Sequence, residues 1–207
     1  QECHLHNGRL VLIEGDILAM AMTDITCSIT GDVHSLRPGG WKLVANIPYY
    51  ITGAILRHIL GGDNQPASMT LLMQKEVAHR IVKRDGKESI LSLAVAAYGT
   101  PRTIRTVSSR AFSPPPKVDS AILHITDISK DHFKSDTDEE RFFQLVKKGF
   151  AHKRKKLLRN LTNKNDGDRL SAAFERCEIP HDTRAEKVVL KKWLCLAQEL
   201  GYNETHE

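Results

Sequence analysis

The sequence lacks the features that would tie the protein to a membrane. Among its 207 residues there is no run of about eighteen apolar residues, the length that spans a bilayer. The first residues, which include Glu2, His4 and His6, do not form a signal-peptide pattern. Internal repeats and low-complexity tracts are missing too. With 41% hydrophobic residues the chain can form a core, so we expect one or two globular domains in the cytoplasm.

The spacings typical of metal ligands are also missing. The four cysteines are far apart and form no C-x-x-C pair, which argues against zinc and gives no support to a disulfide framework: Cys3, Cys27, Cys177 and Cys195. The ten histidines show no H-x-x-x-H spacing. We therefore predict that the protein binds no metal and keeps its thiols reduced in the cytosol.

Positive charge is only slightly in excess but is unevenly placed. Lys and Arg total 30 against 25 Asp and Glu, which gives a net charge of +5. Residues 152–159 contain five basic side chains, whereas residues 127–140 hold most of the nearby acidic ones. This asymmetry predicts a polyanion-binding face beside an acidic connector.

The apolar pattern predicts an α/β fold followed by helices. Short apolar runs predict strands at 10–13, 43–45, 69–73, 103–107 and 121–125, and longer patterns predict helices at 52–60, 75–83 and 90–98. Alternating strands and helices favour a mostly parallel sheet covered on both faces. The last two strands have no helix between them, so we expect them to pair antiparallel.

A polar stretch at 127–137 separates this part from a smaller helical one. Thr137 and Glu140 have the spacing of a capping box, and the apolar residues that follow recur at helical spacing. We therefore predict a sheet domain at 1–126, a linker at 127–137 and a small helical domain at 138–207.

The most informative segment is Asn46-Ile47-Pro48-Tyr49, which directly follows the strand at 43–45. Open α/β sheets bind ligands at the carboxyl ends of their strands. The Asn46 side-chain carbonyl and the Pro48 backbone carbonyl can both accept hydrogen bonds from one amino group, while the Tyr49 ring can stack on a flat heterocycle. Alternatively, Asn46 caps a turn and Pro48 merely ends a strand.

Five further segments accompany this motif in order. They are Glu14-Gly15-Asp16-Ile17, residues 73–78 (MQKEVA), residues 112–120 (FSPPPKVDS), residues 150–160 (FAHKRKKLLRN) and Arg184-Ala185-Glu186. Together with the Asn-Ile-Pro-Tyr segment, this series resembles the ribosomal RNA adenine dimethyltransferases from about Leu10 to the end. The basic segment makes the chain more similar to members that act on small-subunit RNA than to the antibiotic-resistance members that act on large-subunit RNA.

The resemblance implies the Rossmann-like sheet of methyltransferases that use S-adenosylmethionine (SAM). It implies dimethylation of the N6 amines of two adjacent adenines in small-subunit ribosomal RNA of an immature subunit, by a monomer. The implied catalytic residues are Asn46, Pro48, Tyr49 and Phe112, and the implied cofactor contacts are Asp16, Ile17 and Asn46. Asp16 also fits a simple capping role.

RNA phosphates are expected to bind an exposed basic set: Lys117, Lys153, Arg154, Lys155, Lys156 and Arg159. We interpret residues 153–159 as part of a helix. Its lysines and arginines would share one exposed face, and Leu157 and Leu161 would lie on the buried face. Arg102, Arg105 and Arg110 could extend this surface. A solvated helix face is the plain alternative.

The sequence departs from the family at one point. The family's glycine-rich SAM loop precedes the segment matched by Gly15-Asp16, and Gly8 and Gly15 form no G-x-G pattern. The chain also starts with Gln1 rather than Met, so we expect it to be the later part of a longer protein. The missing loop keeps a second interpretation open, that of a non-catalytic RNA-binding factor for ribosome assembly.

Overall fold

The computed structural model describes residues 13–22, 38–162 and 167–201. The chain forms two compact units. Residues 1–78 and 99–129 make up the sheet unit, and residues 79–98 and 130–207 make up the helical unit. The domain division with a linker at 127–137 stays a prediction. No helix of the described residues is long and apolar enough to cross a membrane.

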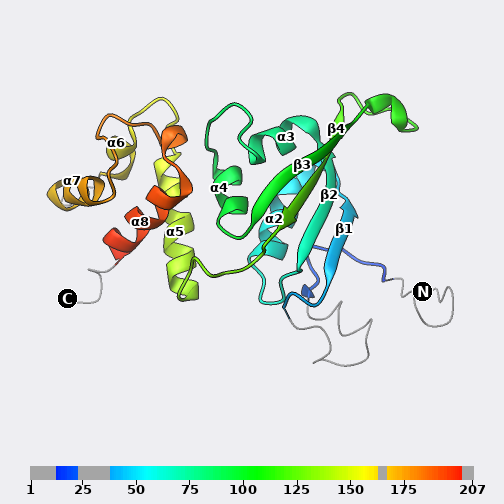
Figure 1. Cartoon of the computed structure of the whole chain (residues 1–207), viewed down its shortest axis with the longest axis horizontal. Coiled ribbons are helices and arrows are strands. Elements are labelled where there is room, and N and C mark those ends of the chain that lie inside the picture. The colour runs from blue at the N-terminus through cyan, green and yellow to red at the C-terminus, as the bar shows by residue number, and fades with distance from the viewer. Residues whose placement is uncertain (1–12, 23–37, 163–166, 202–207) are drawn as a thin grey trace. The chain divides into compact units, whose positions relative to one another are not determined.

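Among the described residues, the sheet unit contains four strands that lie in the order β1-β2-β4-β3 (Figure 1). Their bounds are Lys42–Asn46, Ser68–Gln74, Thr100–Val107 and Ser120–Thr126 for β1 to β4. The β1–β2 pair is parallel, whereas β4 is antiparallel to both of its neighbours. The four strands predicted in these regions are confirmed, as is the antiparallel β3–β4 pair.

The expectation of a mostly parallel sheet is wrong for the described strands. Because β4 returns from β3 without a helix, it runs against β3, and it also inserts beside β2 in the opposite direction. The strand predicted at 10–13 lies almost wholly outside the described residues. Ile13 and the residues after it form no strand, and a turn follows at residues 17–19.

One face of the sheet forms the core of this unit. The facing pairs Met69–Ile125, Leu71–Leu123 and Met73–Ala121 on β2 and β4 are all 0% exposed. Helix α2, Thr52–Leu60, lies behind the sheet in Figure 1 and buries Ile55, Leu56, Ile59 and Leu60. On the other face, Leu72 and Ile122 are only half-buried. The alternation follows from the period of two in a strand, and cover on both faces is not seen in the described residues.

Strand β1 forms one edge of the sheet and ends at the Asn-Ile-Pro-Tyr segment. In the described part of the chain it pairs with β2 alone. Val44 at its centre is 80% exposed. A short 3-10 helix, η1 at Tyr49–Ile51, leads from the strand end into α2.

The helical unit contains α4 (Ile90–Ala96), α5 (Asp136–Gly149), α6 (Leu157–Leu161), α7 (Gly167–Arg176) and α8 (Leu190–Gly201). Helix α3, Lys75–Ile81, leads into this unit from β2. The largest side chains of its core are fully buried: Trp193, Phe142, Phe174 and Leu93. Apolar residues three and four positions apart on these helices supply this core, as their spacing predicted.

Two local predictions in this unit are wrong. The N-cap of α5 is Ser135, whose hydroxyl accepts from the Asp138 N–H at 3.2 Å, and not Thr137. Ser135 carries a hydroxyl acceptor like that of Thr137 but lies two residues earlier. The helix therefore begins at Asp136, and Thr137 lies inside it. The basic segment is also not one helix, because α5 ends at Gly149 and α6 begins only at Leu157.

The expectation of reduced thiols is wrong for two of the four cysteines. Cys177 and Cys195, 18 residues apart, form a disulfide whose Cα atoms are 5.8 Å apart. Cys177 follows α7 and Cys195 lies within α8, so the bond joins these two helices. Sequence spacing could not reveal this pair, because it depends on how α7 packs on α8.

We predict that Gly149→Ala destabilises the helical unit. A Cβ at Gly149 would clash with the Trp193 ring and lie 2.7 Å from a Leu157 methyl, and both of these side chains are fully buried. Overpacking of this kind costs about 1–3 kcal/mol, measurable by thermal or urea unfolding. Gly167→Ala is the matched control, because nothing lies within 4 Å of its Cβ. Equal stability of the two variants would contradict the close packing at Gly149.

We also predict that Cys177 and Cys195 resist alkylation in protein purified without reductant. A disulfide sulfur is not a thiolate nucleophile, so iodoacetamide should label both residues only after reduction. Peptide mass spectrometry before and after reduction measures this. Labelling of either residue without reductant would show that the bond is not formed.

Candidate active site

The end of β1 places the Asn-Ile-Pro-Tyr segment at the carboxyl edge of the sheet. The Ile47 N–H donates to the Leu72 carbonyl at 3.3 Å, and the Ile47 side chain is 4% exposed. Pro48, with φ −58° and ψ 133°, then turns the chain into η1. Ile47 thus anchors the segment in the core, and the residues on either side of it, Asn46 and Pro48, remain exposed.

A cavity of about 380 Å³ opens at this point. It is lined by Asn46, Ile47, Pro48 and Tyr49 from the strand end and by Phe112, Ser113, Pro114 and Pro116 from the loop between β3 and β4. The structure therefore brings together the four residues predicted to be catalytic, although Phe112 is far from the other three in sequence. The cavity combines two aromatic rings with two carbonyl acceptors.

Both predicted acceptors have capacity left for a ligand. The Asn46 side chain makes no hydrogen bond with the described residues and is exposed. The Pro48 carbonyl accepts from the Ile51 N–H at 3.2 Å. Since a carbonyl oxygen has two lone pairs, one remains. The site can therefore offer two oxygens to an amino group, one from a side chain and one from the backbone.

The Tyr49 ring is half-buried and is held at its far end. Its hydroxyl shares a 2.7 Å hydrogen bond with the hydroxyl of Ser120, at the start of β4. The neighbouring Tyr50 is 88% exposed and does not line the cavity. Only Tyr49 of this pair is therefore placed to stack on something in the cavity.

Phe112 is carried by the loop of residues 108–119, which we call the 108–119 loop. The loop begins with a 3-10 turn, η2 at Ser109–Ala111, and the Phe112 N–H donates to the Ser109 carbonyl at 3.2 Å. The Ser113–Pro114 peptide bond is cis. The prolines that follow have fixed φ angles and no N–H donors, which limits the loop's freedom.

Asp119 fastens this loop at its base. Its Oδ1 accepts from the Ser109 N–H at 3.1 Å, and its Oδ2 lies 3.5 Å from the Lys75 ammonium. The Ser109 hydrogen bond holds the pKa of the Asp119 carboxyl below its usual value, and Lys75 lowers it further. Asp119 is therefore ionised at neutral pH and remains an acceptor for both groups.

The two predicted cofactor residues near the start of the chain do not line this cavity. The Asp16 carboxylate is exposed and accepts from the Leu18 N–H at 2.9 Å. The Ala19 N–H donates to the Asp16 carbonyl, also at 2.9 Å, which closes a turn. Ile17 within this turn is half-buried. Asp16 therefore closes a turn and does not cap a helix, and its second carboxylate oxygen is left over.

The predicted RNA-binding residues are all exposed: Lys117, Lys153, Arg154, Lys155, Lys156 and Arg159. Lys117 lies on the 108–119 loop of the sheet unit. Residues 153–156 lie in the turn between α5 and α6, which we call the basic turn, and Arg159 lies on α6. The Leu157 N–H donates to the Thr183 carbonyl at 2.8 Å, which fixes the end of the basic turn.

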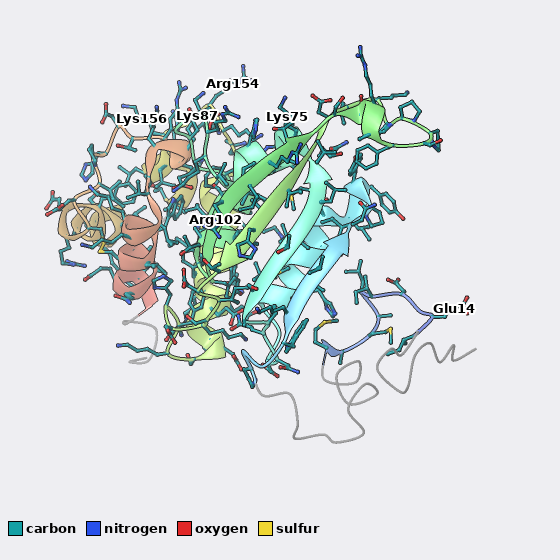
Figure 2. The ribbon with its side chains drawn as sticks, turned by 45° about the vertical axis from the view of Figure 1, so that its right-hand side comes forward. Glu14, Lys75, Lys87, Arg102, Arg154 and Lys156 are labelled. Atoms are coloured by element: carbon teal, nitrogen blue, oxygen red, sulfur yellow. A yellow bond between two sulfur atoms is a disulfide. The ribbon has the colours of Figure 1, made fainter. Side chains whose placement is uncertain are left out.

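Sequence reasoning missed Lys87 as a neighbour of this set. The Glu88 N–H donates to the Glu186 carbonyl at 2.8 Å, and the Lys87 ammonium lies 4.0 Å from the Glu186 carboxylate. Residues 183–186 thereby hold both the segment at 87–88 and the basic turn. Figure 2 shows Lys87, Arg154 and Lys156 extending from the same end of the helical unit. The position of Lys87 depends on backbone hydrogen bonds between residues far apart in the sequence, so no local motif could predict it.

Comparison with known proteins decides the family. The sequence profile of the family described as ribosomal RNA adenine dimethylase matches residues 2–201. The chain belongs to this family. A ribosomal RNA small subunit methyltransferase A from Dehalococcoides mccartyi is 39% identical over 160 residues, which cover 75% of this chain. The resemblance drawn from the motifs is thus confirmed.

Solved structures agree with the family on the fold. The crystal structure of the 23S rRNA methyltransferase ErmE matches with a TM-score of 0.62 and 25% identity, over 82% of this chain and 70% of that chain. A dimethyladenosine transferase from Plasmodium falciparum matches with a TM-score of 0.73 and 20% identity, over 91% and 71%. The predicted methyltransferase-like α/β fold is confirmed. The match to the Dehalococcoides relative covers 55% of its length, so the chain spans little more than half of that protein.

Proposed function

We propose that the protein transfers methyl groups from SAM to the N6 amines of two adjacent adenines in small-subunit ribosomal RNA. The observation that carries this proposal is the cavity that unites Asn46, Pro48 and Tyr49 with Phe112. Family membership supports the reaction class. The relative's name, ribosomal RNA small subunit methyltransferase A, supports the small-subunit target over the large-subunit target that the more distant ErmE acts on.

The two oxygens of the site prepare a poor nucleophile. Adenine's N6 lone pair is delocalised into the ring. When the two N6 protons donate to Asn46 Oδ1 and the Pro48 carbonyl, the nitrogen becomes more tetrahedral and its lone pair more available. The same oxygens stabilise the positive charge that develops on nitrogen, which is preorganised electrostatic stabilisation. The alkylated amine then loses a proton to water, so the site needs no strong base.

The aromatic rings hold the extruded base. Flipping an adenine out of its stack costs a few kcal/mol, and each base–aromatic stack is worth about 1–3 kcal/mol. Tyr49 on one side and Phe112 on the other would offset that cost. They would also orient the amine toward the two carbonyls, because the positions of the rings and of the acceptors are fixed by the same strand end and loop.

We propose that Asp16, Ile17 and Asn46 contact the cofactor. The left-over carboxylate oxygen of Asp16 can accept from an adenine amine, and Ile17 can cover the ring beside it, so the residues suit the cofactor chemically. When bound, SAM supplies an electrophilic methyl group on its sulfonium. Asn46 would then lie between the cofactor and the target amine.

RNA phosphates are proposed to bind the exposed basic residues Lys117, Lys153, Arg154, Lys155, Lys156 and Arg159, with Lys87 beside the basic turn. Contacts to phosphate fix the position of an RNA without reading its sequence. The natural partner would be an immature small ribosomal subunit in the cytoplasm, and the protein would act as a monomer.

We predict that Asn46→Ala in the full-length protein lowers methyl transfer about 10²–10³-fold, the usual effect of removing one preorganised polar group. RNA affinity should not change, since Asn46 carries no charge and contacts from Lys and Arg to phosphate dominate the affinity for RNA. Transfer of labelled methyl to immature small subunits measures the rate. Asn46→Asp is the matched control, which keeps an oxygen acceptor in place and should retain more activity than Ala. Wild-type rates in Asn46→Ala, with RNA binding intact, would overturn the role of Asn46, whereas no methyl transfer by the full-length wild type would favour the non-catalytic assembly factor.

We predict that neutralising Lys153, Arg154, Lys155 and Lys156 flattens the salt dependence of RNA binding. Each lost phosphate contact should reduce the slope of log K against log salt by about 0.7–0.9. Filter binding over a series of salt concentrations measures the slope. Lys134→Ala is the control, because this exposed lysine precedes α5 and lies roughly 20 Å from the basic turn, given the rise of about 1.5 Å per residue. An unchanged slope in the fourfold variant would remove the basic turn from the RNA interface.

A further inference from the structure

Two consecutive residues, Asp119 at the end of the 108–119 loop and Ser120 at the start of β4, are tied to the two segments that carry the aromatic rings of the cavity. Ser120 is 0% exposed, and its hydroxyl bonds the hydroxyl of Tyr49, 71 residues earlier in the chain. Asp119 bonds the Ser109 N–H at the base of the 108–119 loop, which carries Phe112. Neighbouring side chains therefore bond to Tyr49 and to the base of the loop that carries Phe112.

The backbone of these two residues is itself fixed on both sides. Ser120 pairs with Gln74 of β2 and with Val107 of β3, because β4 lies between those strands. The Lys75 N–H donates to the Asp119 carbonyl at 3.0 Å, and the Lys75 ammonium reaches the Asp119 carboxylate. Ser120 thus lies on a rigid strand, and Asp119 directly beside it is held by Lys75, so both can hold their partners accurately.

We propose that Asp119 and Ser120 are positioning residues that set the separation between Tyr49 and Phe112 and so the width of the slot for the flipped base. Ser120 acts directly on Tyr49, and Asp119 acts on Phe112 through the 108–119 loop. This inference rests on the proposed function, which supplies the base, but the contacts themselves are independent of it.

The Ser120 bond fixes one particular freedom of Tyr49. The hydroxyl lies on the long axis of the ring, so the bond sets χ1, and hence where the ring lies, while rotation about the ring axis stays less restricted. Without the bond, Tyr49 can leave the side of the cavity by changing rotamer. A buried Ser hydroxyl also needs a partner, and within the described residues the Tyr49 hydroxyl provides it for Ser120.

The Ser120 arm of the test removes the same hydrogen bond from each end. Ser120→Ala and Tyr49→Phe should each lower kcat by roughly three- to tenfold, the range expected for one neutral hydrogen bond, with a smaller change in KM. The double variant should lose no more than either single one, because all three lack the same bond. Tyr49→Phe keeps the stacking ring, so it still tests the bond if Ser120→Ala fails to fold.

A second readout needs no catalysis. An RNA oligonucleotide with 2-aminopurine at the target position loses fluorescence when the base stacks on an aromatic ring. Quenching by the wild-type protein should weaken in Ser120→Ala and in Tyr49→Phe. Wild-type kcat and wild-type quenching in both variants would overturn the role of Ser120.

The Asp119 arm uses two substitutions that differ in one property. Asp119→Ala removes the acceptor for the Ser109 N–H, whereas Asp119→Asn keeps an oxygen at that position and loses only the charge. Trypsin should cut the 108–119 loop after Arg110 and Lys117 several-fold faster in Asp119→Ala than in the wild type or Asp119→Asn. Equal cleavage of the three proteins would overturn the role of Asp119.

The arms separate this inference from the proposed function. If the full-length wild type methylates RNA but the variants behave like it, only the positioning roles fail. If the wild type transfers no methyl group, the proposed function fails, while fluorescence and proteolysis still decide the roles of Ser120 and Asp119.

Discussion

The insertion of β4 between β2 and β3 is the constraint on which the site depends. Because β4 runs antiparallel to both neighbours, its first residues lie at the edge where β2 ends and near the end of β1. The fully buried pairs of β2 and β4 fix the register of this insertion, since a shift by one residue would turn Leu71 and Leu123 away from the core. Core packing thereby determines which hydroxyl meets Tyr49.

The same arrangement joins two motifs that are far apart in the sequence. The Asn-Ile-Pro-Tyr segment supplies the oxygens and one ring, and the 108–119 loop supplies the other ring. Neither segment makes a cavity alone. They meet because the loop leaves β3 and returns through β4. Ser120, the first residue of β4, bonds back to Tyr49, and Asp119, the last residue of the loop, bonds back to Ser109. The chemistry of the site is therefore a consequence of strand order as much as of motif residues.

Much of this could be predicted from the sequence, for physical reasons. Helix α2 was predicted at its observed bounds, Thr52–Leu60, because an apolar stripe and two glycines mark its length. The predicted ends of the four described strands lie within three residues of the observed ends, because each strand is a short apolar run with polar residues around it. Asn46, Pro48 and Tyr49 are adjacent in the chain, so their clustering needed no tertiary information. Phe112 joined them only through a family resemblance.

The failures all concern contacts between distant residues or a choice between similar neighbours. The Cys177–Cys195 pair depends on how α7 meets α8. The break between α5 and α6 ends where the Leu157 N–H bonds to the distant Thr183 carbonyl. Ser135 and Thr137 carry equivalent hydroxyls, so local pattern could not choose the cap. Spacing along the chain likewise gave no sign that Ser120 would face Tyr49.

The edge of β1 that faces away from β2 determines what else this strand can pair with. Outside its pairing with β2, the described part of the chain leaves the backbone amides and carbonyls of residues 42–46 without a strand partner, beside the outward-facing Val44. Such a flat, apolar margin is a template for the addition of a foreign strand. A strand added along residues 42–46 would therefore satisfy this row of donors and acceptors and shield Val44 from water.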